Sequence, residues 1–299
     1  VEWERQNFGS MQEYSQVVAP LVGQLTDDDG DGVITRNDHP DVVVVADDNG
    51  LDNSDGFGLL VVLDGVDGTT IAAVASAKVG DAEVHPYRYA TPVLADLDAD
   101  GVPEIVTVVR VSMSGGGGGG GGEEPPDTGD GGPSGEPGEG GDDAIGPPAP
   151  EQVPDNPNDW CSVAAFHADG EVQWLSPHLV GCAGHLLAAA DLDGDGLGEI
   201  LANDAVLNFD GSLRWQMAGS SSARAYSEMG ANPVAIDIDG DGSPEVLAGR
   251  TVYTAEGDLH CEIPPDDPDG FPAAADLDGD GLGEFILVGG GEVHVYRDD

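Results

Sequence analysis

The chain has 299 residues and a formal net charge of −49, because 58 Asp and Glu residues stand against nine Lys and Arg residues. Such a charge repels phosphate backbones and anionic lipid surfaces, so we exclude nucleic acid as a partner and expect no direct membrane insertion. No apolar run approaches the roughly 18 residues that a transmembrane helix needs. Self-repulsion at this charge destabilises a compact chain, so either bound cations or adaptation to high salt must offset it. The clustering of aspartate favours bound cations.

The N-terminal segment carries two signals. The chain begins at Val1 without a methionine or a signal peptide, so we expect a processed or excised ectodomain. Residues 1–5 (VEWER) resemble residues 171–174 (EVQW), which we interpret as the outer strand of a later repeat. We therefore expect the N-terminus to supply a strand to the last repeat, which by itself offers only three strands.

Four segments downstream share the pattern D-x-D-x-D-G-x-x-E between two short apolar runs. They span residues 96–104, 191–199, 237–245 and 276–284, and a looser copy starts at Asp27. Most successive copies begin about 40 to 50 residues apart once residues 114–158 are set aside, and this period is typical of propellers and solenoids. Residues 114–158 are rich in Gly, Pro, Glu and Asp, so we predict a disordered insertion within a single domain, 1–299.

Between the acidic loops lie paired apolar runs joined by Gly-containing turns. These runs, residues 59–75, 162–176, 205–217 and 251–263, predict β-hairpins. Each repeat then supplies four strands, one before the acidic loop, one after it, and a hairpin. The sequence therefore predicts an all-β protein, a β-propeller of four-stranded blades. We count about five blades, with a fragment of a larger propeller as the alternative.

The acidic loops have the composition of calcium sites. Alternate acids on a tight turn offer hard oxygen ligands, and Gly at position six permits the bend. We expect acids at positions one, three, five and nine and the carbonyl at position seven to bind Ca²⁺. These residues are Asp96, Asp98, Asp100, Val102 and Glu104; Asp191, Asp193, Asp195, Leu197 and Glu199; Asp237, Asp239, Asp241, Ser243 and Glu245; and Asp276, Asp278, Asp280, Leu282 and Glu284. Magnesium is disfavoured, since it prefers few carboxylates and several waters.

The first loop departs from the pattern. Asp27, Asp29 and Asp31 are in register and the Val33 carbonyl takes position seven, but no acid stands at position nine. We expect Asp38 at position twelve to be the last ligand, with Asp41 as the alternative. The expected content is four to five calcium ions.

The loop blocks also resemble a known family. Residues 91–105 (TPVLADLDADGVPEI), 232–246 (NPVAIDIDGDGSPEV) and 271–285 (FPAAADLDGDGLGEF) are similar to FG-GAP/VCBS repeats, the calcium-loop blades of integrin alpha-like propellers. The resemblance implies calcium at positions one, three, five and nine, and adhesion or ligand binding at the cell surface. Propellers of this family usually have seven blades, where we count five.

No catalytic motif is present, so we predict a binding module for an extracellular protein or glycan. Residues near the expected innermost strands are candidates for a ligand pocket at one propeller mouth: His85, Arg88, Tyr89, His185, Arg224, Tyr226 and Phe271. A basic pocket on so acidic a chain would suit an acidic sugar. Loop packing is the plainer interpretation, and a polysaccharide lyase-like site is a further one. A third class is a structural surface or filament subunit.

Three cysteines are present. Cys161 and Cys182 could form a disulfide in an oxidising compartment, with three buried free thiols, Cys261 included, as the alternative. Together with the acidic loops, this predicts an extracellular or cell-surface protein.

Overall fold

The computed structural model describes residues 3–4, 14–16, 18–48, 56–113, 160–178, 180–182, 186–202, 205–217, 232–263 and 270–297. The predicted insertion at 114–158 lies outside the described residues. The regular structure within these ranges is β-strand, so the all-β prediction is confirmed. None of the described segments forms a helix long and apolar enough to cross a bilayer.

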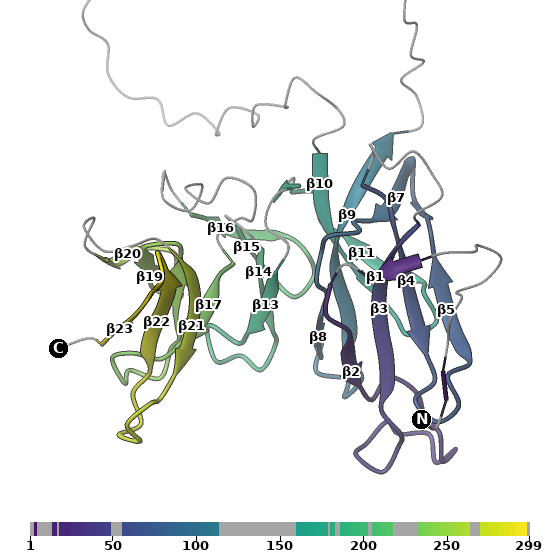
Figure 1. The fold of residues 1–299 in the computed structure, drawn as a ribbon, viewed down its shortest axis with the longest axis horizontal. Helices are drawn as coiled ribbons and strands as arrows, with labels where there is room; N and C mark the ends of the chain where they lie inside the picture. The colour runs from purple at the N-terminus through teal and green to yellow at the C-terminus, as the bar shows by residue number, and fades with distance from the viewer. Residues whose placement is uncertain are drawn as a thin grey trace, which may run out of the picture.

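The described strands form five antiparallel sheets that follow one another along the chain (Figure 1). The first contains β1 (Tyr14–Gln16), β2 (Leu21–Gly23), β3 (Asp41–Asp48), β4 (Gly58–Leu63) and β5 (Thr70–Val74). The second contains β6 (Ala77–Val79), β7 (Ala82–Pro86), β8 (Val93–Ala95), β9 (Glu104–Met113), β10 (Trp160–Phe166), β11 (Val172–Leu175) and β12 (Val180–Gly181). The third contains β13 (Leu187–Ala190), β14 (Glu199–Ala202), β15 (Ala205–Leu207) and β16 (Leu213–Gln216). The fourth contains β17 (Val234–Ile236), β18 (Glu245–Ala248), β19 (Thr251–Tyr253) and β20 (Leu259–Glu262), and the fifth β21 (Phe271–Ala275), β22 (Glu284–Gly289) and β23 (Glu292–Tyr296).

One strand order recurs in these sheets. β2-β3-β4-β5, β8-β9-β10-β11, β13 to β16 and β17 to β20 each run first strand, acidic loop, second strand and hairpin. The fifth sheet has three strands, as its sequence predicts. The second sheet gains β6, β7 and β12 because β9 and β10 extend beyond the ends of β8 and β11.

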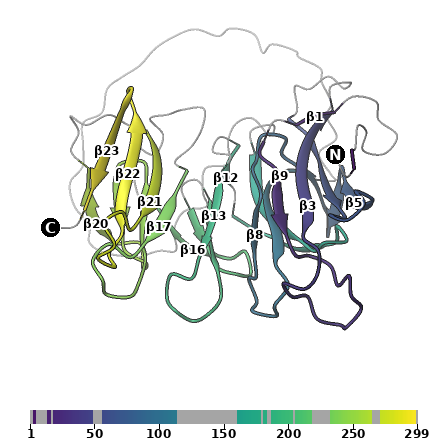
Figure 2. The same cartoon turned by 60° about the horizontal axis from the view of Figure 1, so that its bottom comes forward.

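The sheets lie side by side in a row, with apolar side chains between neighbours. The first strands β2, β8, β13, β17 and β21 contact one another in that order. Alternation along β3 sends Val43 and Val45 toward the second sheet and Val44 to the opposite face. Figure 2 shows the two chain ends at opposite ends of the row.

A tryptophan on the outer strand joins neighbouring sheets. Trp174 lies over the hairpin glycine Gly211 of the next sheet, where an added methyl group would lie 2.5 Å from its ring. Trp215 covers Gly257 in the same way and donates its indole N–H to the Ala255 carbonyl at 3.0 Å. Both glycines have positive φ, at 79° and 90°. Glycine at these positions therefore allows the positive φ of the turn and leaves space for the tryptophan ring of the preceding sheet.

The N-terminal prediction requires a correction. Trp3 covers Gly68 of the first sheet and donates its indole N–H to the Gly65 carbonyl at 3.0 Å. Trp3 thus takes the place that Trp174 takes on the third sheet, as its sequence suggests. However, residues 3–4 are not in a strand, and among the described strands β23 pairs with β22 alone. Among the described residues, the N-terminal segment contacts the first sheet through Trp3, and the predicted fourth strand of the fifth sheet is not seen.

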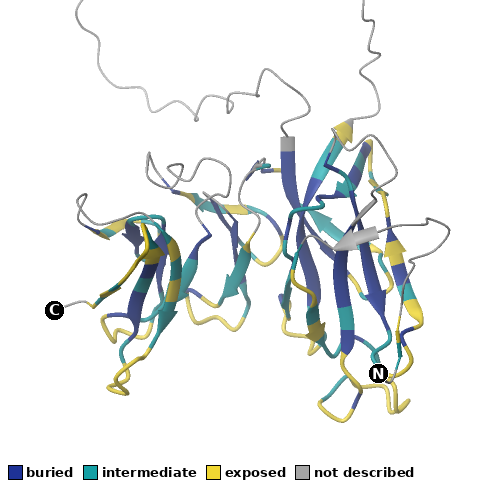
Figure 3. Cartoon of the chain, viewed as in Figure 1, coloured by how far each residue is buried: buried dark blue, intermediate teal, exposed yellow. Residues whose placement is uncertain are grey.

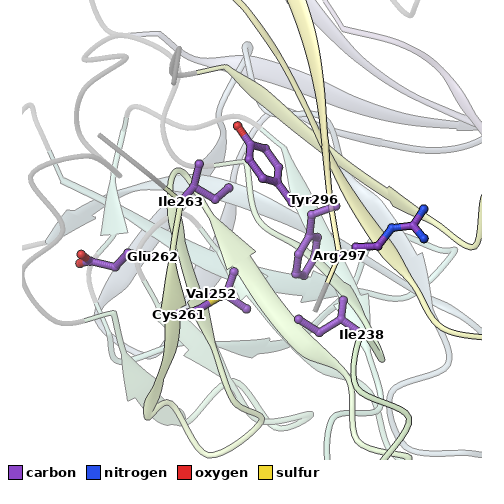
Figure 4. Close-up of a pocket in the computed structure, with 8 residues that line it drawn as sticks. Ile238, Val252, Cys261, Glu262, Ile263, Tyr296 and Arg297 are labelled. Atoms are coloured by element: carbon purple, nitrogen blue, oxygen red, sulfur yellow. The ribbon is translucent and has the colours of Figure 1, made fainter. Parts of the chain in front are cut away.

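The contact between the fourth and fifth sheets lacks a tryptophan. Cys261 pairs with Val252 as Trp215 pairs with Val206, so cysteine stands at the tryptophan position. A pocket of about 160 Å³ lies beside it, lined by Ile238, Val252, Cys261, Glu262, Ile263, Phe285, Tyr296 and Arg297 (Figure 4). The cysteine is much smaller than the indole that covers the hairpin glycine at the two preceding contacts, from the second sheet to the third and from the third to the fourth.

The cysteine alternatives are settled by pairing. Cys161 and Cys182 form a disulfide, which links β10 to the residue after β12. The alternative of three buried thiols is wrong, and Cys261 is exposed.

Filling the pocket should stabilise the protein. We expect Cys261→Trp to raise the free energy of unfolding by about 1 kcal/mol, because the indole buries apolar surface between the fourth and fifth sheets. Thermal unfolding followed by circular dichroism measures the change. Cys261→Ser is the control and should alter stability by less than about 0.5 kcal/mol, since the side chain is exposed. A lower melting temperature for Cys261→Trp would show that the indole does not fit.

Candidate metal sites and an aromatic cluster

The five acidic loops project from the same end of the row of sheets. Each joins a first strand to a second strand, and these strands run in the same sense in every sheet (Figure 1). Figure 3 shows exposed residues concentrated along this lower edge. The chain therefore gathers its most regular acidic segments at one end.

The backbone of each loop is folded around its own aspartates. In the third loop, Asp191 accepts hydrogen bonds from the N–H groups of Gly194 and Gly196, at 2.8 and 3.0 Å. Asp193 Oδ1 accepts from the Asp195 N–H at 3.2 Å, and Asp195 Oδ1 accepts from the Leu197 N–H at 2.8 Å. The other regular loops repeat these bonds, except that Ala99 at position four of the second loop does not donate a hydrogen bond to Asp96. The bonds leave one oxygen of Asp193 and one of Asp195 available for other partners.

The acid at position nine is buried. Glu104, Glu199, Glu245 and Glu284 begin the second strands and are only 2 to 3% exposed. In each, Oε2 accepts the N–H of the residue at position two, at 2.7 to 3.0 Å. Burial raises the pKa of Glu104, Glu199 and Glu245 above the ordinary value, since water is removed from the carboxylate. A nearby cation would offset this cost.

The first loop reaches the same geometry with a different acid. Asp38, 4% exposed, accepts the N–H of Asp28, at position two of the loop, at 3.0 Å. Its other oxygen accepts the Thr35 N–H at 2.7 Å, and this backbone bond is the main reason that its pKa is lowered. Asp41 instead accepts from Leu25 and Thr26, next to β2. The contacts thus favour Asp38 over Asp41 as the equivalent of the position-nine acid.

The donor sets fit a hard divalent cation. Ligand oxygens lie within 4.8 Å of one another in several groups of three predicted acids, among them Asp27, Asp29 and Asp31; Asp96, Asp98 and Glu104; and Asp191, Asp193 and Glu199. A fourth group is Asp237, Asp239 and Asp241, and His260 joins Asp239 and Glu245 in another. Carboxylate oxygens in such number suit calcium. The sequence pattern did not indicate that His260 lies close to the fourth loop, because this closeness depends on how β20 lies against that loop.

The predicted pocket residues separate into groups. His85 on β7 stacks on Phe57, with ring centroids 4.1 Å apart. The Arg88 guanidinium lies 4.4 Å from the centre of the Tyr89 ring. His185, Arg224 and Tyr226 lie outside the described residues. Phe271, 40% exposed, starts β21 in the fifth sheet, away from the second sheet (Figure 1).

The structure adds residues to this aromatic cluster that sequence reasoning missed. Tyr87 packs edge-on against Tyr89, with ring centroids 5.7 Å apart, and burial raises the pKa of Tyr87. The Arg110 guanidinium lies 5.8 Å from the centre of the Tyr87 ring. Arg110 is on β9 opposite His85, a strand pairing that sequence spacing does not reveal. Its Nε is buried and has no hydrogen-bond partner among the described residues.

The chain matches no protein-family model, and no curated protein gives a significant match. Among solved structures it is similar to the biofilm matrix protein Bap1 of V. cholerae, at 26% identity and a TM-score of 0.62. That similarity covers 96% of this chain and 37% of Bap1, so the chain spans well under half of that protein's length.

Two rhamnogalacturonan lyases, YesW and PL11 of Bacillus licheniformis, are each 15% identical, with TM-scores of 0.30 and 0.28. The similarity covers 95% of this chain and 72% of each lyase. At these scores the likeness carries no argument about function.

One loop position tests the backbone geometry. Ala99 stands at position four with a positive φ of 59°, where the other loops have glycine. We expect Ala99→Gly to stabilise the protein by about 0.5 to 1 kcal/mol, because the left-handed conformation is strained for alanine. The reverse change, Gly194→Ala, is the matched control and should cost about 1 kcal/mol, since its φ is 73° and no atom obstructs the methyl group. Urea unfolding in EDTA measures both, and destabilisation by Ala99→Gly would contradict the expectation.

Proposed function

We propose that this chain is a calcium-stabilised extracellular β-propeller of the FG-GAP/VCBS type, with the five sheets as its blades, and that it acts as a binding or adhesion module. The observation that carries the proposal is the repeated buried glutamate at position nine. It begins the second strand directly after the loop aspartates, and in the second and third loops its carboxylate lies within 4.8 Å of two of them. The Cys161–Cys182 disulfide supports an oxidising, extracellular location.

The similarity to Bap1 supports an adhesive role. Bap1 is a biofilm matrix protein, and 96% of this chain is covered by the similarity. A structural role in an extracellular matrix is compatible with the same likeness. The proposal therefore includes two roles, binding of a glycan or protein ligand and assembly as a surface subunit. Both roles use the calcium-stabilised fold.

Calcium removal tests the proposal directly. We expect native mass spectrometry in millimolar calcium to detect four or five bound ions. Excess EDTA should lower the melting temperature by more than about 10 °C, because several ions bind the folded state alone. Asp237→Asn should remove one ion and serves as the site-specific check. A protein without bound ions, and with the same melting temperature in EDTA, would refute the calcium proposal and leave salt adaptation to explain the acidity.

The aromatic cluster supports a second, more specific candidate. Arg88 and Arg110 are two of nine basic Lys and Arg residues, and each lies over a tyrosine ring. Aromatic faces stack on sugar rings, while guanidinium groups pair with carboxylates. We therefore propose an acidic glycan as the ligand class. The alternative of a polysaccharide lyase-like active site remains a prediction, and we base no proposal on it.

Binding to uronic acid oligosaccharides tests this candidate. On a glycan array, we expect Arg110→Ala to weaken binding at least about tenfold, because a charge-assisted hydrogen bond is lost. Lys78→Ala is the matched control, since it removes an equal charge from an exposed position on β6. Equal binding by the Arg110→Ala variant and the parent would exclude this site.

A further inference from the structure

The regular loops differ in the side chain that faces them. On the outer strand, the residue before the tryptophan position is Gln173 in the second sheet, Arg214 in the third and His260 in the fourth. Gln173 Nε2 lies 3.4 Å from Asp98 Oδ2 of its loop. In the third sheet the same position carries a permanent positive charge. The loops therefore share their ligands but not their electrostatic environment.

Arg214 contacts the oxygens that the loop backbone leaves available. Asp193 Oδ1 and Glu199 Oε2 accept backbone N–H groups. The Arg214 guanidinium lies 2.8 Å from Asp193 Oδ2 and 3.3 Å from Glu199 Oε1. Two of the expected calcium ligands thus bind this arginine through their remaining oxygens.

The burial of these groups makes the contact strong. Arg214 and Asp193 side chains are 21% and 34% exposed, and the Glu199 side chain is 2% exposed. The arginine holds the pKa of Asp193 below the ordinary value. A charged pair in so little water is weakly screened, and removal of one partner leaves an uncompensated charge.

The fifth loop shows the same arrangement from a different strand. Arg297, which follows β23, lies 3.3 Å from Asp278 and 3.7 Å from Glu284. Its side chain is 51% exposed, so the contact is weaker than that of Arg214. The first, second and fourth loops have no arginine in this position among the described residues.

We propose that Arg214 is the resident cation of the third loop, so that this loop keeps its shape without a divalent ion and binds calcium more weakly than the second loop. Only the claim of weaker calcium binding rests on the proposed function; the claim that the ion-free loop keeps its shape does not. Calcium and the guanidinium group require the same oxygens of Asp193 and Glu199. The third loop fills only when Arg214 gives them up, and the fifth loop follows the same rule less strongly.

The chain supplies its own exchange experiment. Arg214→Gln gives the third loop the side chain of the second, and Gln173→Arg does the reverse. Native mass spectrometry across a calcium titration counts bound ions, and thermal unfolding in EDTA reports the ion-free state. Arg214→Lys, which keeps the charge but loses the fork of donors, is the control.

We expect Arg214→Gln to lower the melting temperature in EDTA and to let one ion bind at a calcium concentration at least about tenfold lower. Gln173→Arg should shift one ion at least about tenfold the other way and should raise the melting temperature in EDTA. Arg214→Lys should lie between the parent and Arg214→Gln. Unchanged titrations and unchanged melting in EDTA for both exchanges would overturn the inference.

Failure of the two proposals can be told apart. If the parent binds no ion in millimolar calcium, the proposed function falls, and the EDTA melting of the Arg214→Gln variant still tests the resident cation. If the parent binds ions but neither exchange moves the titration, calcium binding stands and the inference is wrong. If Arg214→Gln does not fold, Gln173→Arg decides the question, because it adds a charge without breaking an ion pair.

Discussion

The hydrogen bond from the position-two N–H to the buried carboxylate at position nine is the contact on which the acidic end of the structure depends. In the four regular loops it joins the start of the loop to the start of the second strand, seven residues away. It also places a charge where water is scarce, and such a charge is costly unless it is paired. The loop aspartates add repulsion. We therefore propose that the fold requires positive charge near these loops, and in the third and fifth loops Arg214 and Arg297 supply part of it.

This requirement links the fold to its proposed function. The five loops lie at one end of the row, so an external cation would stabilise every sheet from the same side (Figure 3). The aromatic cluster of Tyr87, Arg88, Tyr89 and Arg110 belongs to the second sheet and its neighbouring segment. Stability and ligand binding are thus assigned to different residues. Loss of one need not entail loss of the other.

Two of the four contacts between successive sheets follow one rule. An indole from one sheet lies on a hairpin glycine of the next, and Trp3 does the same on the first sheet. At the contact between the first and second sheets, Ala72 and Val74 instead lie against the hairpin glycine Gly170. At the last contact Cys261 replaces the indole, and a pocket remains. The outer face of the fifth sheet is also exposed, with Val288, Val293 and Val295 at 47 to 64%. The last sheet is therefore the least supported part of the described structure.

The sequence by itself determined the four-strand repeat, the hairpins and the position of the acidic loops, whereas it did not indicate β6, β7 and β12. The predicted features depend on the alternation of apolar and polar residues and on hydrogen bonds between residues at most nine positions apart. A short stretch of sequence is therefore enough to predict them. Asp38 was predicted for the same reason, from its spacing within one loop, and the structure places it buried against the start of that loop.

Contacts between distant residues were decided by the tertiary structure alone. Trp3 contacts a turn 62 residues away, so its position on the first sheet depends on tertiary packing. Arg214 reaches Glu199 across 15 residues, and Arg110 lies beside Tyr87 through strand pairing. No local pattern encodes these contacts, because they depend on which strands pair and which sheets pack together.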